Sequence, residues 1–521
     1  MPEAVEIAKL RLFLTLAARL ERPEEIEPLP DLDFNIRTGN LLVGFRDLED
    51  ARSRVACDLV SENVVQALLP KALRLVAVRD AFIDAIEDAA GSDEVAILKH
   101  RLVEASDVLR QLADGVYFTA EGHGSPDDPA HEEAFVDWRD QSRPFHWFIE
   151  FPHVVERGGF DVVIGNPPYV ATPSTVDLGY SRLGYLTRGA PDLYAVCVER
   201  AESLRRAPNG RFSMIVPLSA SFSEDFATLR GVLREASDVI WWSTYSRLPD
   251  GLFAGNARIR NTIVCTHGPF GAAKKEWVTR HHVWASAFRP HLFSTIEYFE
   301  SQPDAVSAAP LRAGRALATV AAILALPRRA LAGDAEVLFR PTGQYWTPVL
   351  PGPVPMVDGA GRPIRLDPGL HTFASVDSRR LAIAVCVCAG NVGYSWWSAW
   401  GDDFHFTRGV MAGLLERVLP VVEDDVDLSC KASAVVARAW DSAFYTMNAG
   451  NGYVNIRYPD VRAELAEFDE LLLDRLGVDD SVFRDLQIWY RQVMRGWEPG
   501  PKSRSLPAEL VDVLRTGQAA W

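Results

Sequence analysis

The segment FDVVIGNPPYV, residues 160–170, constrains the fold more than any other part of this chain. An apolar run leads directly into a polar turn that contains two consecutive prolines. Because proline has a fixed φ and no backbone N–H, such a pair cannot continue a helix or a central strand. The sequence therefore predicts a buried strand that ends in a rigid turn, built from Asn166, Pro167, Pro168 and Tyr169.

Helix-like and strand-like patterns alternate along the first half of the chain. An amphipathic helix is predicted over residues 4–21, a short strand with a Gly-Asn turn in DFNIRTGNLLVGF, and a helical pair over residues 61–115. After the turn, helix and strand alternate through DLYAVCVERAESLRRAPNGRFSMIVP, FATLRGVLREASDVIWWSTY and RIRNTIVCTH. This alternation indicates an α/β fold with a mostly parallel sheet, whose ligands bind beyond the carboxyl ends of the strands.

The pattern changes after about residue 270. Turns such as PGPVPMVDGAGRP break the chain into short pieces, and tryptophans gather in GYSWWSAWGDDFHF. We interpret residues 1–270 as one domain with a helical insertion at about 47–140, and residues 271–460 as a separate α+β domain. Residues 461–521 are predicted to be a helical C-terminal segment, with its clearest helix in ELAEFDELLLDRLG.

Composition excludes several classes of protein. The formal net charge of −16 argues against a nucleic-acid coat protein, although DNA binding depends on where the positive charge lies. The six cysteines show no metal-type spacing, and Cys386 and Cys388 are predicted to be core thiols on a buried strand. Few cysteines, no secretory signal and an N-terminal apolar run interrupted by charges indicate a cytoplasmic protein without a membrane span or a metal site.

One window is basic despite the acidic total. Between Gly255 and His291 the sequence holds six Lys or Arg residues and one acid, Glu276, a local net charge of 6 − 1 = +5, with four histidines and several aromatics interleaved. This window is either a solvated basic face or a contact with DNA phosphates. The candidate DNA-binding residues are Arg258, Arg260, Lys274, Lys275 and Arg280.

The polar turn suits chemistry on an exocyclic amine. Such an amine on adenine is a poor nucleophile, because its lone pair is delocalised into the ring. The side-chain oxygen of Asn166 and the backbone carbonyl of Pro167 could accept its N–H groups, and the prolines would hold both acceptors in place. Tyr169 offers a flat face for a base that has left the double helix. The alternative, an ordinary turn at the end of a strand, stays open for these four residues taken alone.

The wider sequence resembles a known family. FDVVIGNPPYV is similar to motif IV of the gamma-class N6-adenine DNA methyltransferases, in particular the branch related to type IIG restriction–modification enzymes. AVEIAKLRLFLTL resembles motif II of that family, and PLPDLDFNIRTGNLLVG resembles motif III. DLYAVCVERAESLRR and GRFSMIVPLSASF resemble motifs V and VI, and LFAGNARIRNTIV resembles motif VIII. The resemblance covers roughly residues 1–268.

The resemblance implies an incomplete Rossmann-like methyltransferase sheet, and it implies roles for individual residues. Asn166, Pro167, Pro168 and Tyr169 would form the catalytic set, and Phe253 would border the flipped base with Tyr169. Asn40 and Asp192 would contact S-adenosylmethionine. Residues 271–460 would recognise the target site in double-stranded DNA. For Phe253 a core position, and for Asp192 a helix cap or packing role, remain alternatives.

The sequence departs from the family at the cofactor site. A Gly-rich loop after the first strand and an acidic residue after the second, which hold S-adenosylmethionine, would both precede Met1, so the binding site is expected to be incomplete. A separate polypeptide could supply this segment, the start could be misassigned or the gene truncated, or catalysis could have been lost. The expected function is a component of a site-specific adenine-N6 DNA methyltransferase in a restriction–modification or phage-defence system. The alternative is a non-catalytic DNA-recognition or assembly subunit.

Overall fold

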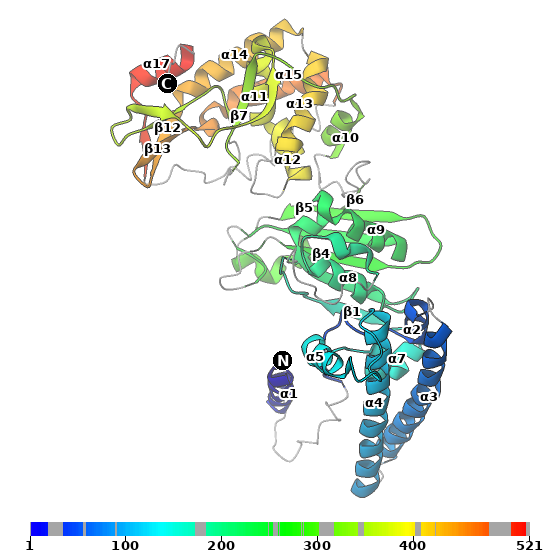
Figure 1. The fold of residues 1–521 in the computed structure, drawn as a ribbon. Helices are drawn as coiled ribbons and strands as arrows, with labels where there is room; N and C mark the ends of the chain where they lie inside the picture. Colours follow the sequence, from blue (N-terminus) through cyan, green and yellow to red (C-terminus); the bar gives the residue numbers. More distant parts are fainter. Residues whose placement is uncertain are drawn as a thin grey trace. The chain divides into compact units, whose positions relative to one another are not determined.

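The computed structural model describes residues 2–18, 35–55, 59–88, 91–171, 184–247, 250–253, 259, 261–282, 284, 286–301, 317–341, 349–401, 408–422, 424–478 and 502–516. The chain forms two compact units (Figure 1). The first consists of Met1–Val216, Asp225–Ile240 and Val264–Lys274, and the second of Pro217–Glu224, Trp241–Ile263 and Lys275–Trp521. The predicted domain boundaries at residues 270 and 460 remain predictions.

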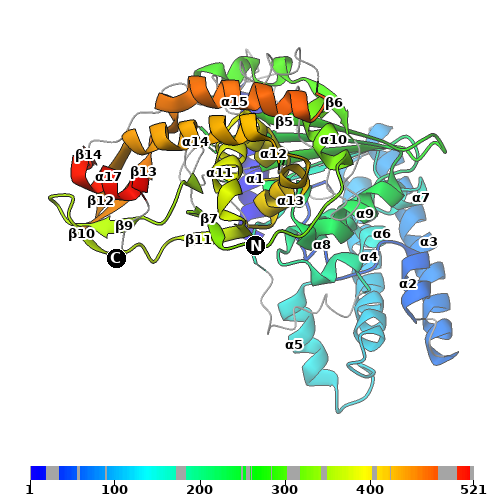
Figure 2. The same ribbon diagram turned by 90° about the horizontal axis from the view of Figure 1, so that it is seen from above.

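Two long helices dominate the first half of unit one. α3 (Leu59–Glu87) and α4 (Ser92–Ala120) lie side by side in both views (Figures 1 and 2), which confirms the predicted helical pair. The pair is held by buried leucines such as Leu75 and Leu109. Shorter helices surround it: α2 (Leu48–Val55), α5 (Glu132–Ser142), α6 (Trp147–Glu150) and α7 (Pro152–Glu156).

A buried histidine fastens the segment that precedes the first strand to α4. His146 is 1 % exposed, and its Nε2 lies 3.0 Å from Oδ1 of Asp114. Its Nδ1 accepts the backbone N–H of Phe45 at 3.1 Å, so the proton resides on Nε2 and is donated to the carboxylate. His146 therefore joins α4, residues 40–46 and residues 144–150 into one support.

Residues 35–47 do not form the predicted strand. They run alongside residues 143–147 through isolated contacts, in which Phe145 N donates to Val43 O at 2.7 Å and Trp147 N donates to Phe45 O at 2.9 Å. Gly44 has a φ of 130°, and a Cβ there would lie 2.3 Å from the Phe145 carbonyl oxygen. The close approach at this glycine turns the backbone out of a regular ladder, so the strand prediction was wrong.

The central sheet has six strands in the order β1-β2-β4-β3-β5-β6. Their bounds are Val162–Gly165 (β1), Arg211–Pro217 (β2), Val239–Tyr245 (β3), Asn261–His267 (β4), Lys275–His282 (β5) and Tyr298–Ser301 (β6). The helices α8 (Tyr194–Glu202) and α9 (Ala227–Ala236) precede β2 and β3, as the alternating pattern predicted.

Strand directions make this sheet mixed. β1 and β2 are parallel, whereas β5 and β6 are antiparallel. The Asp238 N–H donates to His267 O, and the Thr262 hydroxyl donates to Ser243 O. The start of β3 thus lies beside the end of β4, and the end of β3 lies beside the start of β4. These two strands are therefore antiparallel as well. The predicted α/β class is confirmed at the level of a mixed α/β fold, and the share of parallel strands is smaller than expected.

β1 is an edge strand with exposed side chains. It stands first in the strand order and pairs only with β2 among the described residues. Val162 is 59 % exposed and Ile164 is 74 % exposed. The prediction of a buried strand was therefore wrong for the described part of the chain. An apolar run shows which side chains need to be covered, but it does not show whether the covering segment is present.

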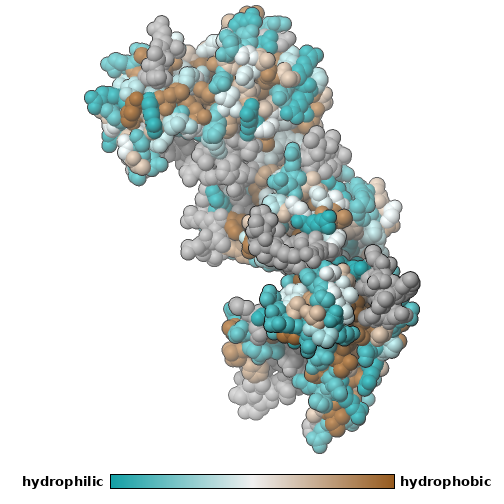
Figure 3. Space-filling model, in the orientation of Figure 1, coloured by the Kyte–Doolittle hydropathy of each residue, from teal (hydrophilic) through white to brown (hydrophobic). Residues whose placement is uncertain are grey.

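The N-terminal helix is exposed along much of its apolar surface. α1 (Pro2–Ala17) confirms the predicted helix, although it ends before residue 21. Ile7, Leu10 and Leu14 are each more than half exposed, and brown side chains are visible on this helix in Figure 3. Contiguous apolar surface of this kind commonly marks an interaction site.

The C-terminal part of unit two combines two further sheets with a group of helices. The strands are β7 (Ala335–Phe339), β8 (Val349–Leu350), β9 (Pro355–Val357), β10 (Pro363–Leu366), β11 (His371–Val376), β12 (Ala443–Asn448), β13 (Asn451–Ile456) and β14 (Ser503–Ser505). The helices are α10 (Leu317–Ala325), α11 (Leu381–Ala389), α12 (Asn391–Trp400), α13 (Arg408–Val422), α14 (Val426–Asp441), α15 (Arg462–Arg475) and α17 (Ala508–Thr516). The strand orders are β11-β7-β8 and β10-β9-β13-β12-β14.

One hydrophobic core spans this whole part, from Val320 to Leu514. The last segment was predicted to be helical, and α15 and α17 agree, but β14 lies between them and pairs with β12. Cys386 and Cys388 are buried as predicted, yet they lie on the helix α11 and not on a strand. A short continuous apolar run has no periodicity that separates a buried strand from a buried helix.

No single helix in the described ranges is long and apolar enough to cross a membrane. One bent pair, Ser378–Ala389 with Asn391–Trp400, has the length and composition for a broken span. Its side chains lie in the C-terminal core, which accounts for their apolar character.

Candidate functional site

The turn that follows β1 leaves one amide free. Gly165 pairs with Met214 of β2, and a Cβ at Gly165 would lie 2.9 Å from the Met214 sulfur, so a larger residue there would displace the end of that side chain. The chain then turns through Asn166, which is exposed. Within the described residues the side-chain amide of Asn166 has no hydrogen-bond partner, whereas Pro167 is half-buried beside it. The turn thus presents an uncommitted amide on a backbone held by proline.

Tyr169 is held by groups on two other elements. Its hydroxyl donates to the backbone carbonyl of Ile215 in β2 at 3.0 Å. Its ring meets the Tyr194 ring edge to face, with centroids 6.4 Å apart, and Tyr194 in turn stacks on Phe226 at 4.9 Å. Tyr169 is half-buried, so its ring has a defined orientation while part of its surface remains open to solvent.

Asp192 lies directly beside this turn. Leu193 N donates to Val170 O at 2.9 Å, and Ala171 forms an isolated bridge with Asp192. The Asp192 carboxylate has no hydrogen-bond or ion-pair partner within the described residues, and burial raises its pKa. The structure therefore brings residues 166–170 and Asp192 together at the start of α8, and the role of Asp192 in a cofactor site stays a prediction.

Asn40 uses its side chain locally. Its Oδ1 accepts the backbone N–H of Leu42 at 3.1 Å, which forms a tight turn. Its own N–H donates to Arg143 O at 2.9 Å. The side-chain oxygen is therefore committed, and the Nδ2 group is the part of Asn40 that remains for a ligand.

Arg200 and Tyr185, which the sequence analysis did not identify, connect residues 42–44 to α8. Arg200 is 3 % exposed; its Nε donates to the Tyr185 hydroxyl at 2.6 Å and one Nη to Gly44 O at 3.1 Å. The Tyr185 hydroxyl donates to Leu42 O at 3.1 Å. Burial lowers the pKa of the guanidinium, but Tyr185 and Asp50 outweigh it and raise that pKa. The arginine within VERAESLRR gave no sign of this role, because its partners are 15 to 156 residues away in sequence.

Phe253 is exposed, and only part of the basic window lies within the described residues. Phe253 lies in unit two and is 39 % exposed, so it is not a core residue in the described structure. Arg258 and Arg260 lie outside the described residues. Lys274 donates to Arg234 O at 2.5 Å, which places its ammonium at the C-terminal end of α9.

The two remaining basic candidates lie on β5. Lys275 and Arg280 are both exposed, and neither side chain forms a hydrogen bond or ion pair within the described residues. Their spacing of five residues places them on opposite faces of the strand. They therefore do not form one continuous basic surface by themselves, and their contact with DNA remains a prediction.

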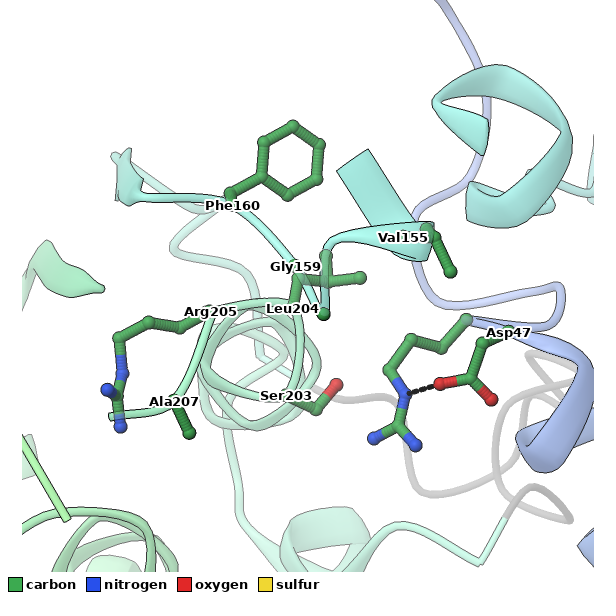
Figure 4. Close-up of a pocket in the computed structure, with 10 residues that line it drawn as sticks. Asp47, Val155, Gly159, Phe160, Ser203, Leu204, Arg205 and Ala207 are labelled. Carbon is green, nitrogen blue, oxygen red and sulfur yellow. Dashed lines mark hydrogen bonds and ion pairs between the residues drawn. The ribbon is translucent and has the colours of Figure 1, made fainter. Parts of the chain in front are cut away.

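The cavity drawn in Figure 4 lies away from this turn. It has a volume of about 250 Å³ and is lined by residues such as Arg46, Gly159 and Phe160, which precede β1, whereas Asn166 follows β1. The neighbouring residues Arg46 and Asp47, which both line it, form an ion pair with Nε and Oδ2 2.7 Å apart. This cavity and the turn at Asn166 thus lie at opposite ends of the four-residue strand β1.

The described residues fit S-adenosylmethionine only in part. The Asp192 carboxylate and the Asn40 Nδ2 group could hold hydroxyl and adenine groups near the turn. The connection from β2 to α9, residues 218–226, contains no glycine, and no described strand is followed directly by a positive-φ glycine that opens an α-helix; Gly184, with a φ of 68°, precedes the 3₁₀ helix Leu186–Gly189. A backbone cradle for the rest of this cofactor is therefore absent from the described residues.

Comparison with known proteins identifies the N-terminal segment. Residues 1–244 match the Eco57I restriction-modification methylase family. The expected resemblance to restriction–modification DNA methyltransferases is confirmed for this segment. A Methanocaldococcus jannaschii protein, described provisionally as the type II restriction enzyme and methyltransferase RM.MjaORFECS2P, is 27% identical over 307 residues, which are 51% of this chain and 25% of that protein. The chain therefore spans about a quarter of the length of this curated relative.

Solved structures of restriction–modification enzymes are also similar to parts of the chain. A cryoEM structure of a DrdV–DNA complex overlaps with 42% of this chain and 26% of its own, at 13% identity and a TM-score of 0.24. A nuclease-deletion mutant of the Type ISP enzyme LlaGI with a DNA substrate mimic overlaps with 48% and 25%, at 13% identity and a TM-score of 0.25.

Proposed function

We propose that this chain carries the base-binding half of a site-specific adenine-N6 DNA methyltransferase of a restriction–modification or phage-defence system. The observation that carries the proposal is the free side-chain amide of Asn166. It directly follows the C-terminal end of β1 and is close in sequence to Tyr169, whose ring is fixed by the hydrogen bond to Ile215. The match of residues 1–244 to a restriction-modification methylase family supports it.

The residues of the turn have distinct tasks in this proposal. The flipped adenine lies against the open face of Tyr169, and its N6 amine donates to Oδ1 of Asn166 and to the Pro167 carbonyl. These acceptors draw the amine toward a tetrahedral geometry, and their fixed positions avoid a reorganisation cost during the reaction. S-adenosylmethionine, when bound, supplies the methyl group that becomes attached to N6. Methyl transfer would break the bond between the methyl group and the cofactor's sulfur, which would leave as a neutral thioether, and the displaced N6 proton would be released to solvent.

The open edge of β1 suggests how the cofactor site is completed. Val162 and Ile164 are exposed, and β1 has no second partner strand among the described residues. Edge strands with free N–H and C=O groups readily accept another strand. We propose that a further segment, on the same or another polypeptide, pairs with this edge and brings a glycine-rich loop to the end of β1 near Asn166.

The proposal is tested by the methylated product. The chain is co-expressed with the coding sequence that precedes it in its genome, and DNA is digested to nucleosides and measured by mass spectrometry. N6-methyladenine that disappears with Asn166→Ala is the expected result. The absence of methylated adenine in the co-expressed wild type, or N4-methylcytosine in its place, would contradict the proposal.

A second candidate is a DNA-recognition or assembly subunit without catalysis. A specific observation favours it: within the described ranges only two side chains, and no glycine-rich cradle, are placed to contact the cofactor. Calorimetry with S-adenosylmethionine on two samples, the purified chain alone and the chain with the pairing segment, separates the two candidate functions. Binding that appears only with that segment supports the methyltransferase, and no binding in either sample supports the subunit.

A further inference from the structure

The hairpin β12–β13 has a strained tip. Asn448 lies opposite Asn451, and the two residues between them have positive φ: 48° at Ala449 and 86° at Gly450. Two consecutive positive values are typical of a type I′ turn, in which asparagine, aspartate or glycine is preferred at the first position. Ala449 is one of only two described non-glycine residues with positive φ. A small apolar side chain held there against backbone preference suggests a functional reason.

The strand register places a set of polar side chains on one face of this sheet. Arg365 lies opposite Met356, Met356 opposite Tyr453, Tyr453 opposite Thr446, and Thr446 opposite Ser503. Paired residues in antiparallel strands point to the same face, as do residues two apart on one strand. The same face therefore also carries Asn448 and Asn451 next to this row. All of these side chains except Met356 are exposed or half-buried.

The strands of the hairpin and β14 differ in charge from the whole chain, while the nearby Asp358, which follows the partner of Gly452, is paired with Arg362. Residues 443–456 and 502–505 contain no acidic residue, although the chain as a whole has a net charge of −16. Arg365 lies on the polar face, and neither its guanidinium nor the Lys502 ammonium forms a hydrogen bond or ion pair within the described part of the chain. Lys502 O accepts the N–H of Met447, which is next to Thr446, so Lys502 points to the opposite face. Free cations thus lie on both sides of the hairpin.

These features match the requirements of a DNA groove. The major groove accepts a pair of β-strands, asparagine forms paired hydrogen bonds with adenine, and an alanine methyl contacts the methyl group of thymine. The phosphates on the two walls of the groove attract cations on both sides of an inserted element. In Figures 1 and 2 the hairpin lies with β14 and α17 at one end of the C-terminal part.

We propose that the β12–β13 hairpin inserts into the major groove of double-stranded DNA, where Asn448 and Asn451 read base edges. Arg365 and Lys502 contact the phosphates on either side. This assignment rests on the proposed function, because it takes DNA as the substrate. It adds the element that determines the recognised sequence.

The test is selection from a pool of DNA duplexes with a randomised centre, bound to the full chain and sequenced. The variants are Asn448→Ala and Asn451→Ala, with Asn209→Ala as the matched control, since Asn209 is an exposed turn residue of unit one. We expect the wild type and the control to enrich one motif. Each hairpin variant should lose roughly tenfold or more of the preference at one or two positions of that motif, with an unchanged melting temperature.

A second arm measures phosphate contacts with Lys502→Gln, and with Lys71→Gln on α3 as the control. The slope of log K against log salt should fall by about 0.9 for Lys502→Gln and stay unchanged for Lys71→Gln. An unaltered motif in both hairpin variants would overturn the inference, as would wild-type binding without any sequence preference. Neither result touches the methylation test, which alone decides the proposed function.

Discussion

The hydroxyl of Tyr169 donates a hydrogen bond to the backbone carbonyl of Ile215, with 3.0 Å between the two oxygens. This bond ties the turn after β1 to the neighbouring strand and sets the plane of the aromatic ring. It separates two roles that a single tyrosine can have: the ring offers a surface for a base, and the hydroxyl positions the ring.

Substitutions at Tyr169 should separate these roles. Tyr169→Phe keeps the ring and loses one hydrogen bond, so we expect a loss of about 1 kcal/mol in the free energy of unfolding and nearly normal capture of the flipped base. Tyr169→Ala removes the stacking surface, which is worth about 1–3 kcal/mol per base. Fluorescence of 2-aminopurine at the target position, in the enzyme with its pairing segment, measures base capture. Equal loss of capture in both variants would show that the ring face is not used.

The exposed edge of β1 leads to a prediction about association. In the absence of the pairing segment, we expect the chain to self-associate through this edge and the apolar surface of α1. Ile164→Thr should reduce the associated fraction in sedimentation velocity experiments, because it keeps a β-branched side chain but removes exposed apolar area. Val426→Thr, at a residue that is 71% exposed on α14, is the matched control and should have no effect. A monodisperse wild-type monomer would argue against an unpaired edge in solution.

The two neighbouring lysines of the basic window should differ in their effects on DNA binding. Lys275 is free within the described residues, so Lys275→Gln should lower the slope of log K against log salt by about 0.9 if it contacts a phosphate. Lys274 already interacts with the C-terminal end of α9, so Lys274→Gln should change this slope less and instead destabilise the fold slightly. Binding titrations at two or more salt concentrations measure both slopes. Identical slopes in the wild type and both variants would remove β5 from the DNA contact.

A buried carboxyl group in the C-terminal core should make stability depend on pH. Burial raises the pKa of Asp469 to about 7, although the backbone and side-chain amides of Asn391 donate to it at 2.6 Å and 2.7 Å. The folded-state pKa is above the unfolded one, so its contribution is fully present at pH values below about 4 and is lost as the pH rises toward 7. The loss is at most about 1.4 kcal/mol per pH unit.

Thermal unfolding between pH 5 and pH 8 measures this dependence. Asp469→Asn is the matched variant, because it keeps the size of the side chain and has an oxygen for Asn391. It should flatten the profile of melting temperature against pH. A variant profile as steep as that of the wild type would assign the dependence to another group.

Local patterns predicted a large part of the fold. The helical pair α3–α4, the helix α8 and the strands β2, β3 and β4 follow from periodicity and turn residues that act within a few positions. The errors share a different cause. Cys386 and Cys388 lie in an apolar run that fits either type of element, residues 35–47 are bent by close approach to Phe145, and the burial of β1 depends on a segment outside its own sequence.

The part of the candidate site that is contiguous in sequence was predictable, and the part that depends on long-range contacts was not. Asn166, Pro167, Pro168 and Tyr169 are contiguous, so a short motif identifies them. Arg200 and Tyr185 act through partners far away in sequence, and the commitment of Asn40 Oδ1 to Leu42 N is a matter of local geometry. Such contacts depend on tertiary structure and leave no mark in one sequence.

The central claim is that the free amide of Asn166 acts on the target amine. The most direct measurement is single-turnover methylation with tritiated S-adenosylmethionine, on the chain with its pairing segment, for the wild type, Asn166→Ala and the control Asn209→Ala. An acceptor that acts chiefly in the transition state should affect the rate and not the affinity. We predict a rate about 10²–10³-fold lower for Asn166→Ala, with DNA binding unchanged and the control at the wild-type rate. A near-normal rate for Asn166→Ala would make residues 166–169 an ordinary strand-ending turn and contradict the account.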